Sequence, residues 1–243
     1  MKFSTNHRMY ILEGNIGSGK STLLKAVGEY LNIDIVPEPA MKWQQDGRAG
    51  NILELFYKDT SRWAYTFQSY AFITRIQAMI EHQKAYPDKE AQLLERSVYC
   101  DRFCFAKHCY EAGFMTALEW KVYREWFSWL VEQYSAIPHG FIYLKVSPEV
   151  ALARMTKRRR SEESGITLDY LQALHHKHEE WLVEMHDVDE PIKKVPVLVL
   201  DGEAEFEQNF DGLEKHLRAI AQFIGVPYHQ PYAVRHKVQQ FLP

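Results

Sequence analysis

Five short segments of the chain are largely apolar, and stretches with helical spacing lie between them. The segments are 9–14 (MYILEG), 33–39 (IDIVPEP), 91–99 (AQLLERSVY), 140–147 (GFIYLKVS) and 195–201 (VPVLVLD). Short apolar runs of this kind are typical of strands that are buried on both faces. We therefore predict a three-layer α/β fold in which helices flank a five-stranded parallel sheet.

The spacing of apolar residues predicts helices between these strands. A first helix follows the first strand and presents one apolar face, formed by Leu23, Leu24, Val27 and Leu31. Longer helical patterns cover 51–85 and about 116–135. After the fourth strand, Ser147 and Pro148 predict a helix start, because serine is a favoured N-cap and proline a favoured first helical residue. The alternation of strands and helices supports parallel pairing of the strands.

The segment ILEGNIGSGKST (11–22) contains the phosphate-loop pattern G-x-x-x-x-G-K-[ST] between the first strand and the first helix. In such a loop, peptide N–H groups converge on phosphate oxygens at the helix N-terminus. We predict that Lys20 holds the outer phosphates and that Ser21 binds Mg²⁺. The expected phosphate-binding residues are Gly14, Asn15, Ile16, Gly17, Ser18, Gly19, Lys20, Ser21 and Thr22. A glycine-rich turn without a ligand is the alternative interpretation.

Composition narrows the class of protein. With 243 residues, of which 46% are hydrophobic and 25% charged, the chain suits a single α/β domain over 1–243. The net charge of −3 lacks the basic footprint of a nucleic-acid-binding protein and favours a small phosphorylated ligand. No apolar run approaches the roughly 18 residues of a membrane span, and the residues before the first strand are too few for a signal peptide, so we expect a cytoplasmic protein. The tail 227–243 matches no pattern with an assignable role.

The cysteines and several histidines raise the question of a metal site. All three cysteines lie in CDRFCFAKHC, where Cys100, Cys104 and His108 are spaced to share one helix face. Ligands from one straight helix rarely surround a tetrahedral ion, so we predict reduced, packed thiols instead. The histidines of LHHKHEEW (174–181) predict a solvated or capped helix face, with Trp181 as its packing partner.

A phosphate loop alone does not distinguish a GTPase, an ATPase and a small-molecule kinase. The GTPase patterns N-K-x-D and D-x-x-G are absent from the sequence. Instead, Glu38 follows the second strand, and Glu95, Arg96 and Ser97 follow the apolar part of the third. Because ligands bind at the carboxyl ends of strands in α/β sheets, these carboxylates and this guanidinium are candidate site residues.

Five spaced motifs give the chain a resemblance to a known family. EGNIGSGKST, VPEPAMKW, RWAYTFQSYAFITRI, ERSVYCDRF and RRRSEESGITLDYL, in this order between about 9 and 225, resemble the deoxyribonucleoside kinases. Deoxycytidine and deoxyguanosine kinases are the most similar members. The resemblance implies a P-loop kinase that transfers the γ-phosphoryl of ATP, or of another nucleoside triphosphate, to the 5′-hydroxyl of a deoxynucleoside for salvage. It also implies Mg²⁺ and a homodimer.

The resemblance assigns roles at the donor end of the site. Glu95 would help Ser21 to hold Mg²⁺, and Arg96 would bind near the transferred group. The run KRRR (157–160) matches an arginine-rich lid whose Arg158 and Arg160 close over the triphosphate. The alternatives are a surface ion pair between Glu95 and Arg96, and a solvated or nucleic-acid-binding patch at KRRR.

At the acceptor end, Glu38 matches the general base, which two flanking prolines hold on a stiff backbone; a solvated loop carboxylate is the alternative. The resemblance implies further contacts to the deoxynucleoside from Trp43, Phe56, Tyr57, Phe67, Gln68, Ala71, Arg75, Asp101, Phe105 and Glu163. Among these, Tyr57 and Glu163 would bind the 3′-hydroxyl, Phe67 and Phe105 would sandwich the base, and Gln68 would read its edge.

The resemblance also implies which nucleobase the enzyme prefers. Arg75 would pair with Asp101, and family members that accept thymidine generally lack this pair. The chain is therefore expected to favour deoxycytidine, deoxyguanosine or deoxyadenosine over thymidine. Pattern alone would make Gln68 and Arg75 a polar stripe on an amphipathic helix.

Two other functions are alternatives to a deoxynucleoside kinase. A nucleoside monophosphate kinase of the thymidylate kinase type shares the loop, the sheet and the lid, but it needs extra cations for the acceptor phosphate, and the acceptor end here offers Glu38, Gln68 and Tyr57. A non-catalytic nucleotide sensor would have no need for the intact set of Lys20, Glu38 and Glu95.

Overall fold

The computed structural model describes residues 8–44, 50–86, 91–134, 137–206 and 209–229. Five strands form one parallel sheet in the order β2-β3-β1-β4-β5. Their bounds are β1 (Arg8–Glu13), β2 (Asp34–Val36), β3 (Ala91–Glu95), β4 (Gly140–Lys145) and β5 (Val197–Asp201). The predicted parallel sheet is confirmed. Most of the predicted tail, 230–243, lies outside the described residues.

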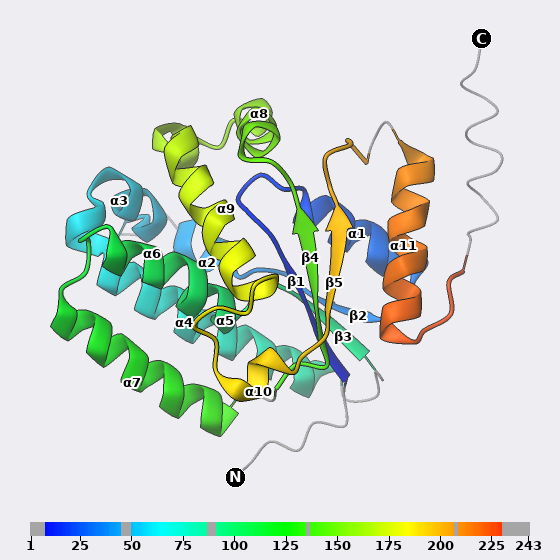
Figure 1. Ribbon diagram of the computed structural model, residues 1–243, viewed down its shortest axis with the longest axis horizontal. Coiled ribbons are helices and arrows are strands. Elements are labelled where there is room, and N and C mark those ends of the chain that lie inside the picture. Colours follow the sequence, from blue (N-terminus) through cyan, green and yellow to red (C-terminus); the bar gives the residue numbers. More distant parts are fainter. Residues whose placement is uncertain (1–7, 45–49, 87–90, 135–136, 207–208, 230–243) are drawn as a thin grey trace.

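Helices cover both faces of the sheet, as Figure 1 shows. On one face lie α1 (Lys20–Tyr30) and α11 (Phe210–Ile224). The other face is covered by α4 (Thr60–Ala85), α5 (Val98–Cys100), α7 (Ala117–Tyr134), α9 (Leu168–Leu182) and α10 (Glu190–Lys193). The remaining elements are α2 (Ala40–Gln44), α3 (Ile52–Lys58), the π-helix η1 (Asp101–Phe105), α6 (Ala106–Glu111), α8 (Pro148–Arg158) and the 3₁₀ helix η2 (Ser161–Gly165). The three predicted layers are therefore present.

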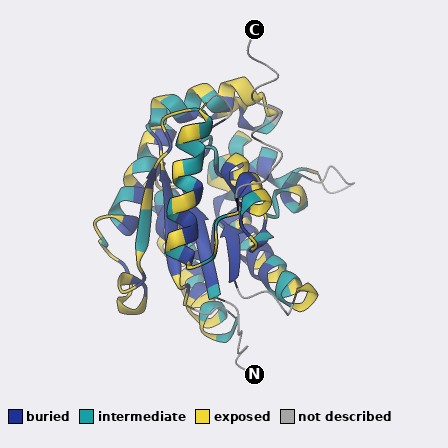
Figure 2. Ribbon diagram, turned by 90° about the vertical axis from the view of Figure 1, so that its right-hand side faces the viewer, coloured by how far each residue is buried: buried dark blue, intermediate teal, exposed yellow. Residues whose placement is uncertain are grey.

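The central strand β1 shows why both faces are apolar. Its residues alternate in direction, so that Tyr10 and Leu12 join the core beneath α1 and α11. Met9 and Ile11 join the opposite core, which contains Phe72 of α4. Figure 2 shows this arrangement as a buried sheet inside a shell of helices that are exposed on their outer sides.

The strand register positions the site. Leu12 of β1 lies opposite Glu95 of β3, so the carboxyl ends of these two strands meet. The phosphate loop leaves β1 at this point, and Arg96 follows β3. Because the neighbours of β1 on its two sides are β3 and β4, the chain connections run in opposite directions here, which is the usual ligand position in a doubly wound sheet.

Two predicted boundaries are wrong. The helical pattern over 51–85 is two helices, because the Asp59 side chain accepts from the peptide N–H of Arg62 at 3.1 Å and starts α4 afresh after α3 ends. The strand predicted over 91–99 ends at Glu95, where Arg96 takes a left-handed φ of 62° and Ser97 caps α5. The start of α8 is as predicted, with Ser147 as N-cap and Pro148 as first residue.

The predicted solvated or capped histidine face on 174–181 is wrong for His178, whereas His176 is exposed. His178 is fully buried, because its side of α9 packs on the sheet and its ring stacks on Tyr143 at 5.9 Å between centroids. It lies with Cys100 and Cys104, and the three ligand-type atoms are all within 4.8 Å of one another. The predicted partner of the two thiols, His108, is absent from this group. The three cysteines are buried free thiols, as predicted.

Trp181 is 2% exposed and packs edge-on against Phe141, which confirms it as the packing residue of this helix. None of the helices in the described part of the chain combines the length and apolar character that a bilayer crossing requires.

Candidate active site

A cavity of about 300 Å³ lies beyond the carboxyl ends of β1, β2 and β3. The predicted residues that line it come from both ends of the expected site: Ile16, Gly17, Gly19, Lys20, Ser21, Thr22, Glu38, Trp43, Phe56, Tyr57, Phe67, Gln68, Ala71, Arg75, Glu95, Arg96, Asp101, Phe105, Arg158, Arg160 and Glu163. Residues from widely separated parts of the sequence thus share one cavity. Gly14, Asn15 and Ser18 do not line this cavity, and each supplies an acceptor oxygen to Nζ of Lys20.

The phosphate loop requires glycine at two positions. A Cβ on Gly14 (φ 152°) would lie 2.6 Å from the carbonyl oxygen of Leu144, and one on Gly17 (φ 76°) would lie 2.3 Å from that of Ala151. Both distances are too short for any side chain, so β4 and α8 press directly on the loop backbone. The loop is therefore held rigidly against the core, as a preformed anion site requires.

Lys20 is buried within the loop. Its Nζ donates to the carbonyl oxygens of Asn15 at 2.7 Å and Gly14 at 3.0 Å. Burial and the nearby Arg96 guanidinium lower the pKa of Lys20 to about 7, against the opposing effect of Glu95. A phosphate group in the cavity would favour the charged form of this amine.

Ser21 and Glu95 form the candidate magnesium position. The Ser21 hydroxyl donates to Glu95 Oε1 at 2.7 Å, which brings a residue of α1 and a residue of β3 together across the end of the sheet. A carboxylate and a hydroxyl oxygen are hard ligands of the kind that Mg²⁺ binds alongside water and phosphate oxygens. The residues present therefore fit the metal that the sequence predicts.

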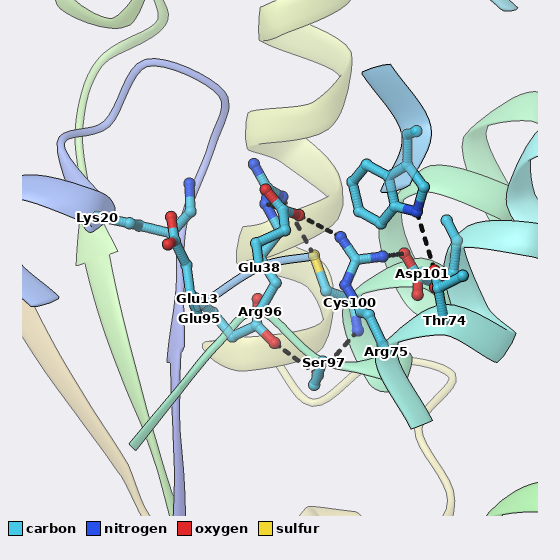
Figure 3. Close-up of polar contacts among 12 residues, drawn as sticks. Glu13, Lys20, Glu38, Thr74, Arg75, Glu95, Arg96, Ser97, Cys100 and Asp101 are labelled. Carbon is cyan, nitrogen blue, oxygen red and sulfur yellow. Dashed lines mark hydrogen bonds and ion pairs between the residues drawn. The ribbon is translucent and has the colours of Figure 1, made fainter. Parts of the chain in front are cut away.

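Glu38 is clamped by two arginines at the acceptor end (Figure 3). Its Oε1 accepts from Nη2 of Arg75 and lies 3.3 Å from Nε of Arg96. Burial alone would raise the pKa of Glu38, but Arg75, Arg96 and Lys20 together hold it below its usual value. The carboxylate is therefore ionised and can accept a proton.

Arg75 also pairs with Asp101, as predicted. Nη1 of Arg75 donates to Oδ1 of Asp101 at 2.6 Å, and the two residues are 9% and 2% exposed. Burial raises the pKa of Asp101 to about 6, although Arg75 opposes the shift. Within the described residues, Nε of Arg75 and Oδ2 of Asp101 are buried and make no hydrogen bond.

Aromatic rings form the walls of the acceptor end. Phe56 stacks on Phe67 with centroids 4.7 Å apart, and the Arg75 guanidinium lies over the ring of Trp43 at 4.8 Å. The Arg96 guanidinium lies over the ring of Phe105 at 4.7 Å. Flat apolar walls with a polar pair at one edge suit a planar heterocycle.

The arginine-rich segment lies at the mouth of the cavity. Arg158, at the end of α8, donates to both carboxylate oxygens of Glu163 at 2.6 Å, and Arg160 lies 3.6 Å from the same carboxylate. The side chains of Arg158 and Arg160 are 36% and 42% exposed. The two arginines line the same cavity as the phosphate loop, and their closure over a triphosphate stays a prediction.

Comparison with known proteins identifies this constellation. The family model described as "Deoxynucleoside kinase" matches residues 10–225. The chain belongs to the deoxynucleoside kinase family. It is 38% identical to "Deoxycytidine kinase 2" of Gallus gallus, over 91% of this chain and 92% of the relative. It is 39% identical to a protein of Fowlpox virus named as a probable deoxycytidine kinase, over 91% of this chain and 90% of the relative. A mitochondrial deoxyguanosine kinase of Xenopus laevis is 35% identical, over 85% of this chain and 87% of the relative.

Family membership makes the chain an ATP-dependent phosphotransferase that acts on deoxynucleosides. The rival interpretation as a nucleoside monophosphate kinase has no support from these comparisons.

The structure adds residues to the kinase site that sequence reasoning missed. Tyr170 of α9 lines the main cavity. A second cavity of about 290 Å³ adjoins the phosphate loop and is lined by Arg154 and Phe206, among others. Arg154 donates to the carbonyl oxygen of Ser18 at 3.1 Å. Arg154 could have been predicted, because it lies one helical turn before Arg158 on α8. Phe206 follows β5 and belongs to no motif that would have indicated it.

Proposed function

We propose that this kinase phosphorylates the 5′-hydroxyl of deoxynucleosides whose base carries an amino group or is a purine, with deoxycytidine foremost and with ATP and Mg²⁺ on the donor side. The observation that carries the proposal is the buried network in which Arg75 bonds both Glu38 and Asp101 inside the cavity that also contains Lys20. One arginine thereby links the expected general base to the expected base-selecting carboxylate.

Polar atoms of Arg75 and Asp101 that make no hydrogen bond within the described residues support this choice of base. Cytosine presents an exocyclic amino group beside an acceptor nitrogen, which matches Oδ2 of Asp101 as acceptor and the Arg75 guanidinium as donor. Thymine has a carbonyl oxygen in place of that amino group, so its lone pairs would face the carboxylate of Asp101. Relatives named as deoxycytidine kinases support deoxycytidine as a substrate.

The side chains divide the reaction between them. Glu38 accepts the proton of the 5′-hydroxyl, because Arg75 and Arg96 keep it ionised. Arg96 and the lid residues Arg158 and Arg160 neutralise charge at the transferred phosphoryl group, and Lys20 with the loop N–H groups holds the donor phosphates. Mg²⁺, held by Ser21 and Glu95, would supply further neutralisation of the phosphates.

The remaining contacts proposed for the deoxynucleoside fix its sugar and base. Tyr57 and Glu163 bind the 3′-hydroxyl, Gln68 hydrogen-bonds the base edge, and the rings of Phe67 and Phe105 hold its faces. These side chains line the same cavity as Glu38.

Replacing Glu38 by glutamine tests the proposed base. Glu38→Gln is expected to bind deoxycytidine nearly as well as the wild type and to lose about 10² to 10⁴ in kcat, the range of general-base catalysis. Equilibrium binding and steady-state kinetics measure the two quantities separately. Retention of more than about a tenth of kcat would show that Glu38 is not the base.

A homodimer and a cytoplasmic location belong to the same proposal. Large apolar side chains are exposed on two neighbouring helices, with Trp126 and Trp129 of α7 at 53% and 49% and Ile73 of α4 at 43%. Exposed apolar patches of this kind mark interfaces. Light scattering on Trp126→Glu with Trp129→Glu would give a monomer if α7 forms the interface. Free buried thiols suit a reducing compartment such as the cytoplasm.

A further inference from the structure

The side of Arg96 that faces away from the cavity is held by a thiol. Nη1 of Arg96 donates to Sγ of Cys100 at 3.7 Å, and both residues are buried. Arg96 itself has a left-handed φ of 62°, a conformation that is strained for a non-glycine residue and persists only where the surrounding structure imposes it. The contacts of its side chain therefore deserve a functional explanation.

Cys100 is in turn bonded to His178, and the hydrogen positions follow from the acceptors. Nδ1 of His178 lies 2.7 Å from the carbonyl oxygen of Leu174, which can only accept, so Nδ1 carries the hydrogen. With the hydrogen on Nδ1, Nε2 of a neutral imidazole is an acceptor for the thiol of Cys100 at 3.6 Å. Burial also raises the pKa of the Cys100 thiol, which keeps its proton. The chain of donors runs from Arg96 to Cys100, then to His178 and to the backbone of α9.

The same helix also supports the phosphate loop. Nδ2 of Asn15 donates to the carbonyl oxygen of Leu171 at 2.8 Å. Leu171 lies three residues before Leu174, whose carbonyl oxygen accepts from His178. Asn15 in turn offers its own carbonyl oxygen to Lys20. Helix α9 thus holds the cation of the loop on one side and Arg96 on the other, and fixes their relative position.

We propose that Cys100 and His178 act as a positioning relay for Arg96, tying its guanidinium to the frame that holds the phosphate loop. The inference rests on the proposed role of Arg96 at the transferred phosphoryl group. Cys100 touches no substrate in this account and acts only through Arg96. The expected signature is a loss of kcat without a loss of deoxynucleoside binding, because positioning of a charge at the reacting centre is realised in the transition state.

The alternative use of this cluster is a metal site formed by Cys100, Cys104 and His178. A divalent cation there would lie beside the Arg96 guanidinium, which already donates to Cys100. The two thiols would also have to lose their protons in a fully buried setting. The contacts present therefore favour the hydrogen-bonded relay.

Four variants test the relay, with kcat, deoxynucleoside KM and melting temperature measured for each. Arg96→Ala should lower kcat by about 10² or more. Cys100→Ala should lower kcat by about tenfold with unchanged KM, whereas Cys100→Ser, which keeps a donor and an acceptor, should restore most of it. Cys104→Ala is the matched control, because Cys104 is equally buried and lies one turn further along, and it should lose stability like Cys100→Ala while keeping wild-type kcat.

The relay is overturned if Cys100→Ser is as slow as Cys100→Ala, if Cys104→Ala is equally slow, or if Cys100→Ala retains wild-type kcat. One equivalent of zinc in the purified protein, lost from both cysteine-to-alanine variants, would also overturn it. Wild-type kcat in Arg96→Ala would instead refute the role of Arg96 in the proposed function, and the relay with it.

Discussion

Removing Asp101 alone is expected to harm the kinase more than removing Asp101 together with Arg75. The two side chains form a buried ion pair with N–O contact at 2.6 Å. Arg75 is 9% exposed, and in Asp101→Ala its guanidinium loses one of its two carboxylate partners. The double variant Arg75→Met with Asp101→Ala removes the buried charge as well.

The magnitude follows from what remains around Arg75. Breaking a buried pair costs about 3 to 5 kcal/mol, and the lower value applies here because Glu38 still bonds Arg75. For a chain of this size, about 3 kcal/mol corresponds to a melting temperature about 6 to 12 °C lower for Asp101→Ala. The double variant should recover most of this loss. Arg75→Met alone serves as the control that leaves a buried carboxylate unpaired.

The same variants report on base selection. The double variant should lower kcat/KM for deoxycytidine and raise it for thymidine, with a shift in preference of about tenfold or more, since each hydrogen bond to a charged partner contributes about 1.5 to 3 kcal/mol. Calorimetry gives the melting temperatures, and steady-state kinetics at 25 °C on the four deoxynucleosides gives the preference. A double variant that is less stable than Asp101→Ala, or that keeps the wild-type order of substrates, would refute the reasoning.

Two further predictions concern the donor end and pH. Lys20→Ala and Arg158→Ala should each lower kcat by about 10² or more while sparing deoxynucleoside binding in the absence of ATP, and a large loss of that binding would place the residue at the wrong end of the cavity. Because burial raises the pKa of Asp101 to about 6, the ionised pair with Arg75 is present above that pH and is lost as the pH falls through it. The pH profile of kcat/KM for deoxycytidine should therefore fall on the acid side near pH 6, and Asp101→Asn should remove this fall. The pKa of Glu38 is below its usual value, so Glu38 is not expected to cause it. A fall near pH 6 that persists in Asp101→Asn would contradict its assignment to Asp101.

The features that pattern predicted are those fixed by local chemistry and strand order. The phosphate loop needs glycine where β4 and α8 press on its backbone, and these requirements appear directly in the motif. The strand pattern placed Glu95 at the carboxyl edge of the sheet, because ligands of α/β sheets bind there. Its pairing with Ser21 at the metal came from family resemblance, and the Ser21 hydroxyl donates to Glu95 at 2.7 Å. The pairing of Arg75 with Asp101 came from family resemblance, and the 2.6 Å contact confirms it.

The pattern of residues along the sequence could not predict contacts between elements that lie far apart in the chain. His178 meets Cys100 across 78 positions of sequence. A π-helix over Asp101–Phe105, which no local signal predicts, contains Cys104 and interrupts the regular helix on which Cys100, Cys104 and His108 would share one face. The clamp of two arginines on Glu38 likewise joins three separate elements. The break at Asp59 was within reach, because aspartate is a favoured N-cap.

We propose that the buried pair of Arg75 and Asp101 directs this deoxynucleoside kinase to substrates other than thymidine. Steady-state kinetics of the purified protein with ATP and Mg²⁺ on deoxycytidine, deoxyadenosine, deoxyguanosine and thymidine tests it most directly. The account predicts that kcat/KM for deoxycytidine is highest and that thymidine is the poorest of the four. Preference for thymidine, or phosphorylation of nucleoside monophosphates without phosphorylation of any deoxynucleoside, would contradict it.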